Sequence, residues 1–477
     1  MPENLRSKTV SGVLWSAVER FSLQGVQFVI NIIMARLLLP SDYGMIGMLA
    51  VFLQISQTFI DSGFSDALIQ KKDRTDKDLS TVFYFNIVLS IILYLLIFLS
   101  APYIADFYHT PKLELVTRII TLNLVIASFS AVHKTILTIN INFKIQSKIS
   151  LIAAIISGGI GITMAFRDFG VWSLVIQSLL NTFLITILSY CYVGWYPLKC
   201  FSKSSFFGLF SFGSKLLISR LIHSVYYNLY AIVIGRRFSP ADLGCYTRAE
   251  QFAIFPSSNI NAIISRVTYP ILSSIQEDDK RLAIAYRKYI RLSSFLIFPL
   301  MLGLAAIANP LINLLLTDRW SGIVILLQIL CLDWMLDHLC QINLNLLLIK
   351  GRSDWALRLE IVKKVIATLI LIVSIPFGIE MMCWGRVLYS IIATYLNTHY
   401  TERLIGLSFK SQMKDIFPSL LLAIMMSGVV FVSTYYIPFD ILKVIGGIFV
   451  GCLFYLSLSW LMRRSEIHEL FTAISTK

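Results

Sequence analysis

Charged residues are scarce in this chain of 477 residues, and no long polar segment interrupts it. Asp, Glu, Lys and Arg make up 14% of the sequence, against about 25% in a typical soluble domain, while 57% of the residues are hydrophobic. This composition excludes a soluble enzyme and a disordered chain. It also excludes a transmembrane β-barrel, because the apolar residues come in long runs rather than in alternation.

Cysteine is sparse and shows no pattern. The seven cysteines form no CxxC pair and fall mostly within apolar segments, where a thiol behaves as a small hydrophobe. We therefore expect no disulfide framework, no metal site and no cofactor. We also expect no enzyme activity, since Asp278 and Asp279, in a basic loop, are the nearest approach to a metal-binding carboxylate pair.

Acidic residues are outnumbered by basic ones, 27 to 41, which gives a net charge of +14. Basic patches can bind nucleic acid, but here they form short clusters between apolar runs, as Lys71, Lys72, Arg74 and Lys77 do. No segment between them is long enough to fold as a nucleic-acid-binding module. We therefore expect no nucleic-acid partner and interpret the clusters as cytoplasmic loops of a membrane protein.

Long apolar runs are what the sequence has in abundance. A bilayer-spanning helix needs about 20 residues, and fourteen segments meet that length. Their approximate limits are 11–38, 45–69, 79–105, 113–137, 149–166, 170–195, 206–235, 242–274, 289–316, 322–348, 355–376, 380–402, 415–437 and 441–462. The fold class predicted is an all-α polytopic membrane protein with about 14 transmembrane helices.

The lysines and arginines between these segments predict the orientation, because positively charged loops stay in the cytoplasm. Counted over the connections, the chain ends and the ends of the adjoining spans, 24 basic residues lie on one side and 7 on the other. The more basic side includes both ends of the chain. We therefore expect a multi-pass protein with both termini in the cytoplasm.

An internal repeat appears when the sequence is aligned with itself at an offset of 200 residues. Arg36, Pro40, Asp42 and Gly44 match Arg236, Pro240, Asp242 and Gly244. Six predicted spans separate the copies, so both enter the membrane from the same side. This predicts two parallel six-helix lobes, 1–200 and 201–405, followed by two helices within 406–477, an arrangement known in transporters that rock two bundles around a central cavity.

Four stretches of sequence resemble bacterial polysaccharide exporters of the Wzx type. They are Ser11–Trp15 (SGVLW), Ala35–Gly44 (ARLLLPSDYG), Asp61–Gln70 (DSGFSDALIQ) and Gly244–Glu250 (GCYTRAE). The resemblance extends over essentially the whole chain, including the number of spans. Such exporters belong with MurJ and the multidrug MATE carriers to one superfamily, the MOP superfamily.

The resemblance implies a flippase that carries an undecaprenyl-pyrophosphate-linked oligosaccharide from the cytoplasmic to the periplasmic leaflet of the bacterial inner membrane by alternating access. The cargo would be a unit of O-antigen, capsule or exopolysaccharide. Besides this glycan and membrane lipid, the candidate partners are a coupling ion, H⁺ or Na⁺, and a polysaccharide polymerase. The alternative is a cation-coupled, MATE-like drug exporter, whose cavity should be rich in acids, whereas this chain places arginines at depth.

Arginines inside the predicted spans are the candidates for binding the diphosphate, because a guanidinium binds phosphate oxygens in a bidentate way and stays charged. The candidates are Arg20, Arg220, Arg266 and Arg248. The first two are related by the repeat, and Arg248 lies near the outer end of its span. The alternative for each is neutralisation by a local acid, which for Arg248 would be Asp242 or Asp42.

Two further ionisable residues are candidates for ion coupling. Asp61 is an acid within a predicted span, which could bind a cation or pair with Arg20, and His223 lies one helical turn from Arg220. The alternative for His223 is a packing role. Asp333 and Asp337 place two carboxylates four residues apart, as a cation site would need, although hydrogen bonding within the helix bundle is the default for such a pair.

Overall fold

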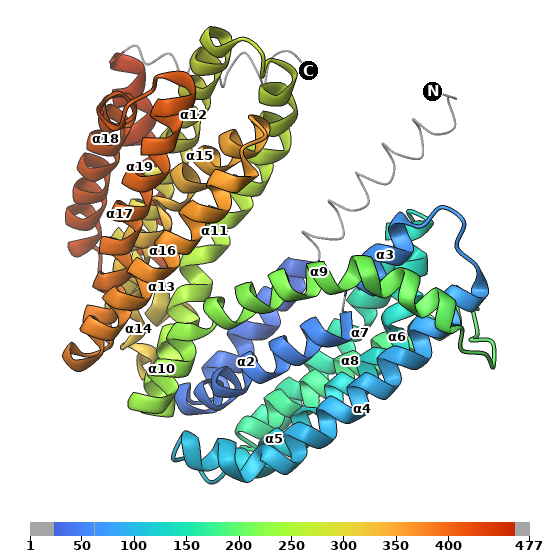
Figure 1. Ribbon diagram of the computed structural model, residues 1–477. Helices are drawn as coiled ribbons and strands as arrows, with labels where there is room; N and C mark the ends of the chain where they lie inside the picture. The colour runs from blue at the N-terminus through green and yellow to red at the C-terminus, as the bar shows by residue number, and fades with distance from the viewer. Residues whose placement is uncertain (1–22, 62, 463–477) are drawn as a thin grey trace. The chain divides into compact units, whose positions relative to one another are not determined.

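The computed structural model describes residues 23–61 and 63–462, and within these ranges every regular element is a helix (Figure 1). The chain divides into two compact units, Met1–Gly244 and Cys245–Lys477. The all-helical class predicted from the sequence is therefore confirmed for the described residues. The repeat-based lobes, with their boundary after residue 200, stay a prediction.

The described part of the first unit contains a helix over Leu23–Leu37, followed by nine further helices. These are α2 (Pro40–Asp61), α3 (Phe64–Gln70), α4 (Asp76–Phe107), α5 (Leu113–Ile120), α6 (Leu122–Ile139), α7 (Phe143–Phe166), α8 (Val171–Val193), α9 (Lys203–Tyr227) and α10 (Leu229–Arg237). Helices α4, α6, α7 and α8 pack side by side, and α9 packs on α2, α3 and α4 (Figure 1).

The second unit contains all but the first five residues of α11 (Pro240–Ser274) and the rest of the described chain. Its other elements are α12 (Asp279–Ala306), α13 (Ala308–Leu315), η1 (Asp318–Trp320), α14 (Ile323–Trp334), α15 (Asp337–Ile349), α16 (Ser353–Ser374), η2 (Ile375–Phe377), α17 (Ile379–Ile405), α18 (Phe409–Tyr435) and α19 (Asp440–Leu461). Helix α18 packs between α12 and α19, and the Tyr455 hydroxyl donates a 3.0 Å hydrogen bond to the Phe295 carbonyl.

Nine helical segments in the described ranges are long and apolar enough to cross a membrane. They are Pro40–Gln70, Asp76–Phe107, Leu113–Ile139, Phe143–Phe166, Val171–Val193, Asp279–Ala306, Ile323–Ile349, Phe409–Tyr435 and Asp440–Leu461. The chain is thus a multi-pass membrane protein. Helices α9, α11, α16 and α17 cover other predicted spans but are less apolar, so the count of fourteen stays a prediction.

Several of the predicted spans are broken rather than continuous. The segment predicted over 322–348 contains α14 and α15, which are separated at Met335 and Leu336, and the segment over 206–235 contains α9 and α10, which meet at Asn228. The Asn228 side chain donates hydrogen bonds to the Ser224 carbonyl (2.8 Å) and to Gln54 Oε1 (2.6 Å). Hydropathy does not show the break at Met335 and Leu336, because these residues are as apolar as their neighbours.

Several helices that start after basic loops carry polar caps. At the start of α4, the Asp78 carboxylate accepts the Thr75 N–H at 2.9 Å, and the Thr75 hydroxyl accepts the Asp78 N–H at 3.4 Å, which forms a capping box. Asn142, Asp278 and Ser408 cap α7, α12 and α18 in a similar way. Each cap satisfies N–H groups that the first helical turn leaves unpaired.

The two repeat corners share their local structure. Pro40 begins α2 and Pro240 begins α11. Asp42 accepts a hydrogen bond from the Leu39 N–H at 3.1 Å, and Asp242 accepts one from the Ser239 N–H, also at 3.1 Å. Each carboxylate therefore lies at the positive end of its helix.

Glycine is required in both corners by a reciprocal close approach. A Cβ added at Gly44 would lie 1.6 Å from the Pro240 carbonyl oxygen, and one added at Gly244 would lie 1.9 Å from the Pro40 carbonyl oxygen. The neighbouring atoms are backbone, so they cannot move aside as a side chain would. The starts of α2 and α11 are in contact because neither glycine carries a side chain.

Candidate functional site

A buried ionic cluster lies next to the break between α14 and α15 in the second unit. The Arg386 guanidinium, on α17, contacts Asp333 Oδ2 on α14 at 2.7–2.8 Å and Glu250 Oε1 on α11 at 2.5 Å. It also donates to the Tyr246 hydroxyl at 2.5 Å, and the Ser390 hydroxyl donates to Asp333. The side chains of Arg386, Asp333 and Glu250 are 13%, 8% and 19% exposed.

This cluster joins three helices that lie far apart in the sequence. It contains two carboxylates and one guanidinium, so ion pairing leaves one negative charge to be balanced by hydrogen bonds, a proton or a cation. Charged groups this deep in a membrane protein survive when they pair or face water. The helix break beside them frees backbone groups, and the Ser257 hydroxyl donates to one of these, the Trp334 carbonyl, at 3.0 Å.

Asp333 and Asp337 do not form a shared cation site. They lie on opposite sides of the helix break, and Asp337 accepts a hydrogen bond from Asn261 Nδ2 at 3.1 Å, whereas Asp333 binds Arg386. His338 is fully buried and hydrogen-bonds with the Ser294 hydroxyl at 2.9 Å. Hydrogen bonding within the bundle, the default expected from the sequence, is what these side chains do.

Arg220, a predicted diphosphate ligand, pairs with a carboxylate of the same unit. Its guanidinium binds Asp66 Oδ2 on α3 at 2.6 Å, and the two side chains are 50% and 38% exposed. Arg248 donates a hydrogen bond to Gln251 Oε1 at 2.6 Å, and its pairing with Asp242 or Asp42 stays an open alternative. Arg266 is exposed on α11, and Arg20 lies outside the described residues.

The candidates for ion coupling, Asp61 and His223, lie on different helices of the first unit. Asp61 is the last residue of α2, and its side chain lies outside the described part of the structure. His223 is exposed on α9, and its ring stacks on Tyr227 with 6.2 Å between centroids and 12° between planes. His223 therefore shares a helix with Arg220, as its position in the sequence requires.

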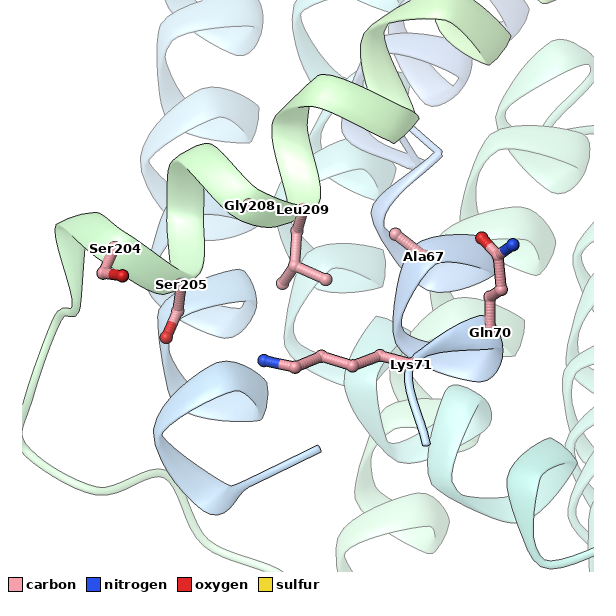
Figure 2. A pocket seen from close by; sticks show the side chains of 7 residues that line it. All are labelled: Ala67, Gln70, Lys71, Ser204, Ser205, Gly208 and Leu209. Atoms are coloured by element: carbon pink, nitrogen blue, oxygen red, sulfur yellow. The ribbon is translucent and has the colours of Figure 1, made fainter. Parts of the chain in front are cut away.

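A polar pocket of about 480 Å³ lies in the first unit, between α3 and the start of α9 (Figure 2). Figure 2 shows the Lys71 side chain extending from the end of α3 toward Ser205, with Gln70 at the rim. The Lys71 ammonium binds the buried Asp78 carboxylate at 2.7 Å. The pocket thus contains a cation already paired with an acid, together with hydroxyl groups from α9.

The ionic cluster around Arg386 was not predicted from the sequence. Each of its ionisable members stands out as a charge within an apolar segment, which is the signal that the sequence offers. Their partners could not be found, because Glu250, Asp333 and Arg386 are separated by 53 to 136 positions, and no periodicity links them.

The fold is one that a solved membrane-protein structure shares. The solved structure of the lipid II flippase MurJ in an inward closed conformation superposes with a TM-score of 0.78, over 95% of this chain and 100% of that one, at 15% sequence identity. This likeness establishes the fold alone. The sequence then identifies the family: residues 33–325 match the model described as "Polysaccharide biosynthesis protein", and the chain belongs to that family.

Two relatives show what kinds of protein the chain is similar to. It is 27% identical over 355 residues to the teichuronic acid biosynthesis protein TuaB of Bacillus subtilis, with 74% of each chain covered. It is 26% identical over 406 residues to the lipopolysaccharide biosynthesis protein WzxC of Escherichia coli, with 83% of this chain and 81% of the relative covered. The resemblance to Wzx-type exporters found in the sequence is therefore confirmed.

Proposed function

We propose that this protein is a flippase that moves an undecaprenyl-pyrophosphate-linked oligosaccharide from the cytoplasmic to the periplasmic leaflet of the bacterial inner membrane by alternating access. Its membership of the polysaccharide biosynthesis family carries the proposal, and a fold shared with a lipid flippase supports it. The cargo would be a unit of O-antigen, capsule or exopolysaccharide. The protein would change the position of this lipid without changing its covalent structure.

In this proposal Arg220 binds the diphosphate by exchanging partners. Its present partner, Asp66, is partly exposed, and an ion pair of that kind contributes roughly 0–1 kcal/mol. A diphosphate can replace the Asp66 carboxylate at little cost, because it carries more charge and offers two oxygens for bidentate binding of the guanidinium. Arg20, Arg248 and Arg266 are the further candidates for contacting the diphosphate along its route.

The coupling ion in this proposal is H⁺ or Na⁺, with Asp61 and His223 as the candidate residues. The moving bodies would be the repeat lobes 1–200 and 201–405, with 406–477 supplying the two appended helices, and both termini would face the cytoplasm. A polysaccharide polymerase would receive the translocated unit on the periplasmic side. The basic loops support this orientation.

Deleting the gene tests the proposal when lipid-linked sugars and surface polysaccharide are analysed together. We expect one polysaccharide to disappear and its undecaprenyl-pyrophosphate-linked unit to accumulate on the cytoplasmic leaflet, with both effects reversed by the wild-type gene. The accumulated sugar would identify the cargo. Unchanged polysaccharide with new sensitivity to cationic compounds would instead assign the protein to drug export.

A further inference from the structure

A second cavity of the first unit, of about 310 Å³, is lined by uncharged polar side chains. It lies between the helix over Leu23–Leu37, α7 and α8. Its polar lining residues are Gln27, Asn31, Ser157, Gln177, Ser178 and Asn181, and its other lining residues, Ile30, Ala154 and Leu174, are apolar. Among the residues that the structure describes, the lining includes no Lys, Arg, Asp or Glu.

The four amides form two matched pairs. Gln27 and Asn31 are four residues apart on one helix, and Gln177 and Asn181 are four apart on another, so each pair shares a helix face. Gly161 on α7 brings Gln177 close, since a Cβ added there would lie 2.9 Å from the Gln177 Cβ. The amide groups of both pairs therefore border one space.

Much of the hydrogen-bonding capacity around this space is unused. Asn181 Oδ1 accepts a long bond from the Ser157 hydroxyl at 3.4 Å, and Asn123 Nδ2 donates to the Ser178 hydroxyl at 2.9 Å. Within the part of the chain that the structure describes, the side chains of Gln27, Asn31 and Gln177 make no hydrogen bond. The side-chain oxygen of Asn123, Oδ1, is buried and has no hydrogen-bond partner in the described part of the chain.

These groups lie at membrane depth. Asn181 is near the middle of α8 and Ser157 is in the inner part of α7, and both helices are long and apolar enough to span the bilayer. An amide left without a partner in hydrocarbon costs several kcal/mol. The cavity must therefore be filled by water or by a polar ligand rather than by lipid chains.

The chemistry of the lining selects among polar ligands. An amide both donates and accepts hydrogen bonds, and so does each hydroxyl of a sugar ring. A diphosphate or a cationic drug would call for side chains of opposite charge, and the described lining consists of uncharged amides, hydroxyls and apolar groups. A volume of about 310 Å³ is at the lower limit of ligand pockets, which range over roughly 300–1,000 Å³, so it fits one ring rather than a whole oligosaccharide.

We propose that this cavity is a binding subsite for one neutral sugar ring of the lipid-linked oligosaccharide. The inference rests on the proposed function, since it names the part of the cargo that the first unit recognises. The amide pairs would replace the water around the ring hydroxyls, and the diphosphate would be bound elsewhere. The cavity would thus contribute glycan selectivity, whereas the arginines would bind any undecaprenyl pyrophosphate.

The test compares two probes on full-length protein in lipid nanodiscs: undecaprenyl pyrophosphate without sugar, and the native lipid-linked oligosaccharide. The variants are Gln177→Leu and Gln27→Leu, which remove an amide at similar volume. The matched control is Gln146→Leu, the same change on α7 outside the cavity. We expect each cavity variant to bind the oligosaccharide lipid about tenfold more weakly, the effect of about one lost hydrogen bond, with binding of the sugar-free lipid unchanged.

The outcomes separate this inference from the proposed function. If the wild-type protein binds the oligosaccharide lipid more tightly than the sugar-free lipid and the cavity variants keep that preference, the subsite is wrong and the cavity holds water only. If the wild-type protein binds neither lipid, the proposed function is wrong, and the subsite proposal that rests on it is wrong as well. Gln27 is exposed, so its variant should fold even if Gln177→Leu does not.

Discussion

At the residue scale, Arg386 compensates two buried acids at once. Replacing it by Met would leave Glu250 and Asp333 without a positive charge in a cluster that is largely buried. Breaking a buried pair by removing one partner typically costs about 3–5 kcal/mol. We expect Arg386→Met to lower the thermal unfolding temperature of the purified protein markedly, or to prevent its accumulation in the membrane.

The matched control is Arg319→Met, which removes an exposed arginine of the same unit and should change stability by no more than about 0.5 kcal/mol. Combining Arg386→Met with Glu250→Gln and Asp333→Asn removes the unpaired charges and should recover part of the loss. If Arg386→Met unfolds at the same temperature as the control, the cluster does not stabilise the second unit.

Arg220 and Asp66 allow the opposite kind of test, because their pair is exposed and weak. We expect Arg220→Ala to reduce polysaccharide export strongly at normal protein abundance, and Asp66→Asn to leave export near the wild-type level. Arg220→Lys should be intermediate, since a lysine keeps the charge but loses the bidentate geometry. Surface polysaccharide, normalised to the amount of protein in the membrane, is the measurement. Normal export by a well-expressed Arg220→Ala variant would remove this residue from the mechanism.

At the element scale, the contact between the starts of α2 and α11 depends on two glycines. We expect Gly44→Ala to destabilise the protein by about 1–3 kcal/mol, because the new methyl group would overlap the Pro240 carbonyl and the helix starts would have to separate. Gly159→Ala is the control, as a Cβ there has no atom within 4 Å. Thermal unfolding of both variants checks this, and equal melting temperatures would contradict the close approach.

Helix breaks are also decided at the element scale. The apolar run over 322–348 predicts one span, and the structure has two helices there, with Asp333 and Asp337 on either side of the break. Hydropathy measures whether a segment prefers lipid, and both helices do. Whether the backbone continues through Met335 and Leu336 depends on groups such as Ser257, which supplies a hydrogen bond from another helix.

At the scale of the whole molecule, the basic loops predict which side each connection faces. In a variant with all seven cysteines replaced, we expect Lys280→Cys to react with a membrane-impermeant thiol reagent only from the cytoplasmic side. Arg319→Cys should react only from the periplasmic side. Labelling of intact cells and of inverted vesicles distinguishes the two. Reaction of both positions from the same side would overturn the predicted orientation and the alternation of the spans.

The amino-acid sequence by itself determined that the chain is a multi-pass membrane protein, that it is helical, and the family to which it belongs. These properties follow from local quantities: the length of apolar runs, caps such as Thr75 and Asp278, and short motifs such as Ala35–Gly44. The likeness of the two corners, Pro40–Gly44 and Pro240–Gly244, was also predictable, because a proline, an acid and a glycine at the same spacing have the same local effect in both.

Only the tertiary structure decided which polar side chains meet inside the membrane. The sequence shows Arg386 as a charge within an apolar segment, but it does not show that Glu250 and Asp333 are its partners. It also does not show that Gln27 and Gln177 border one cavity. A helix face is periodic and can be read from a sequence, whereas the pairing of two faces depends on how the helices pack. That packing depends on close contacts such as the one at Gly161, which arise only when distant parts of the chain come together.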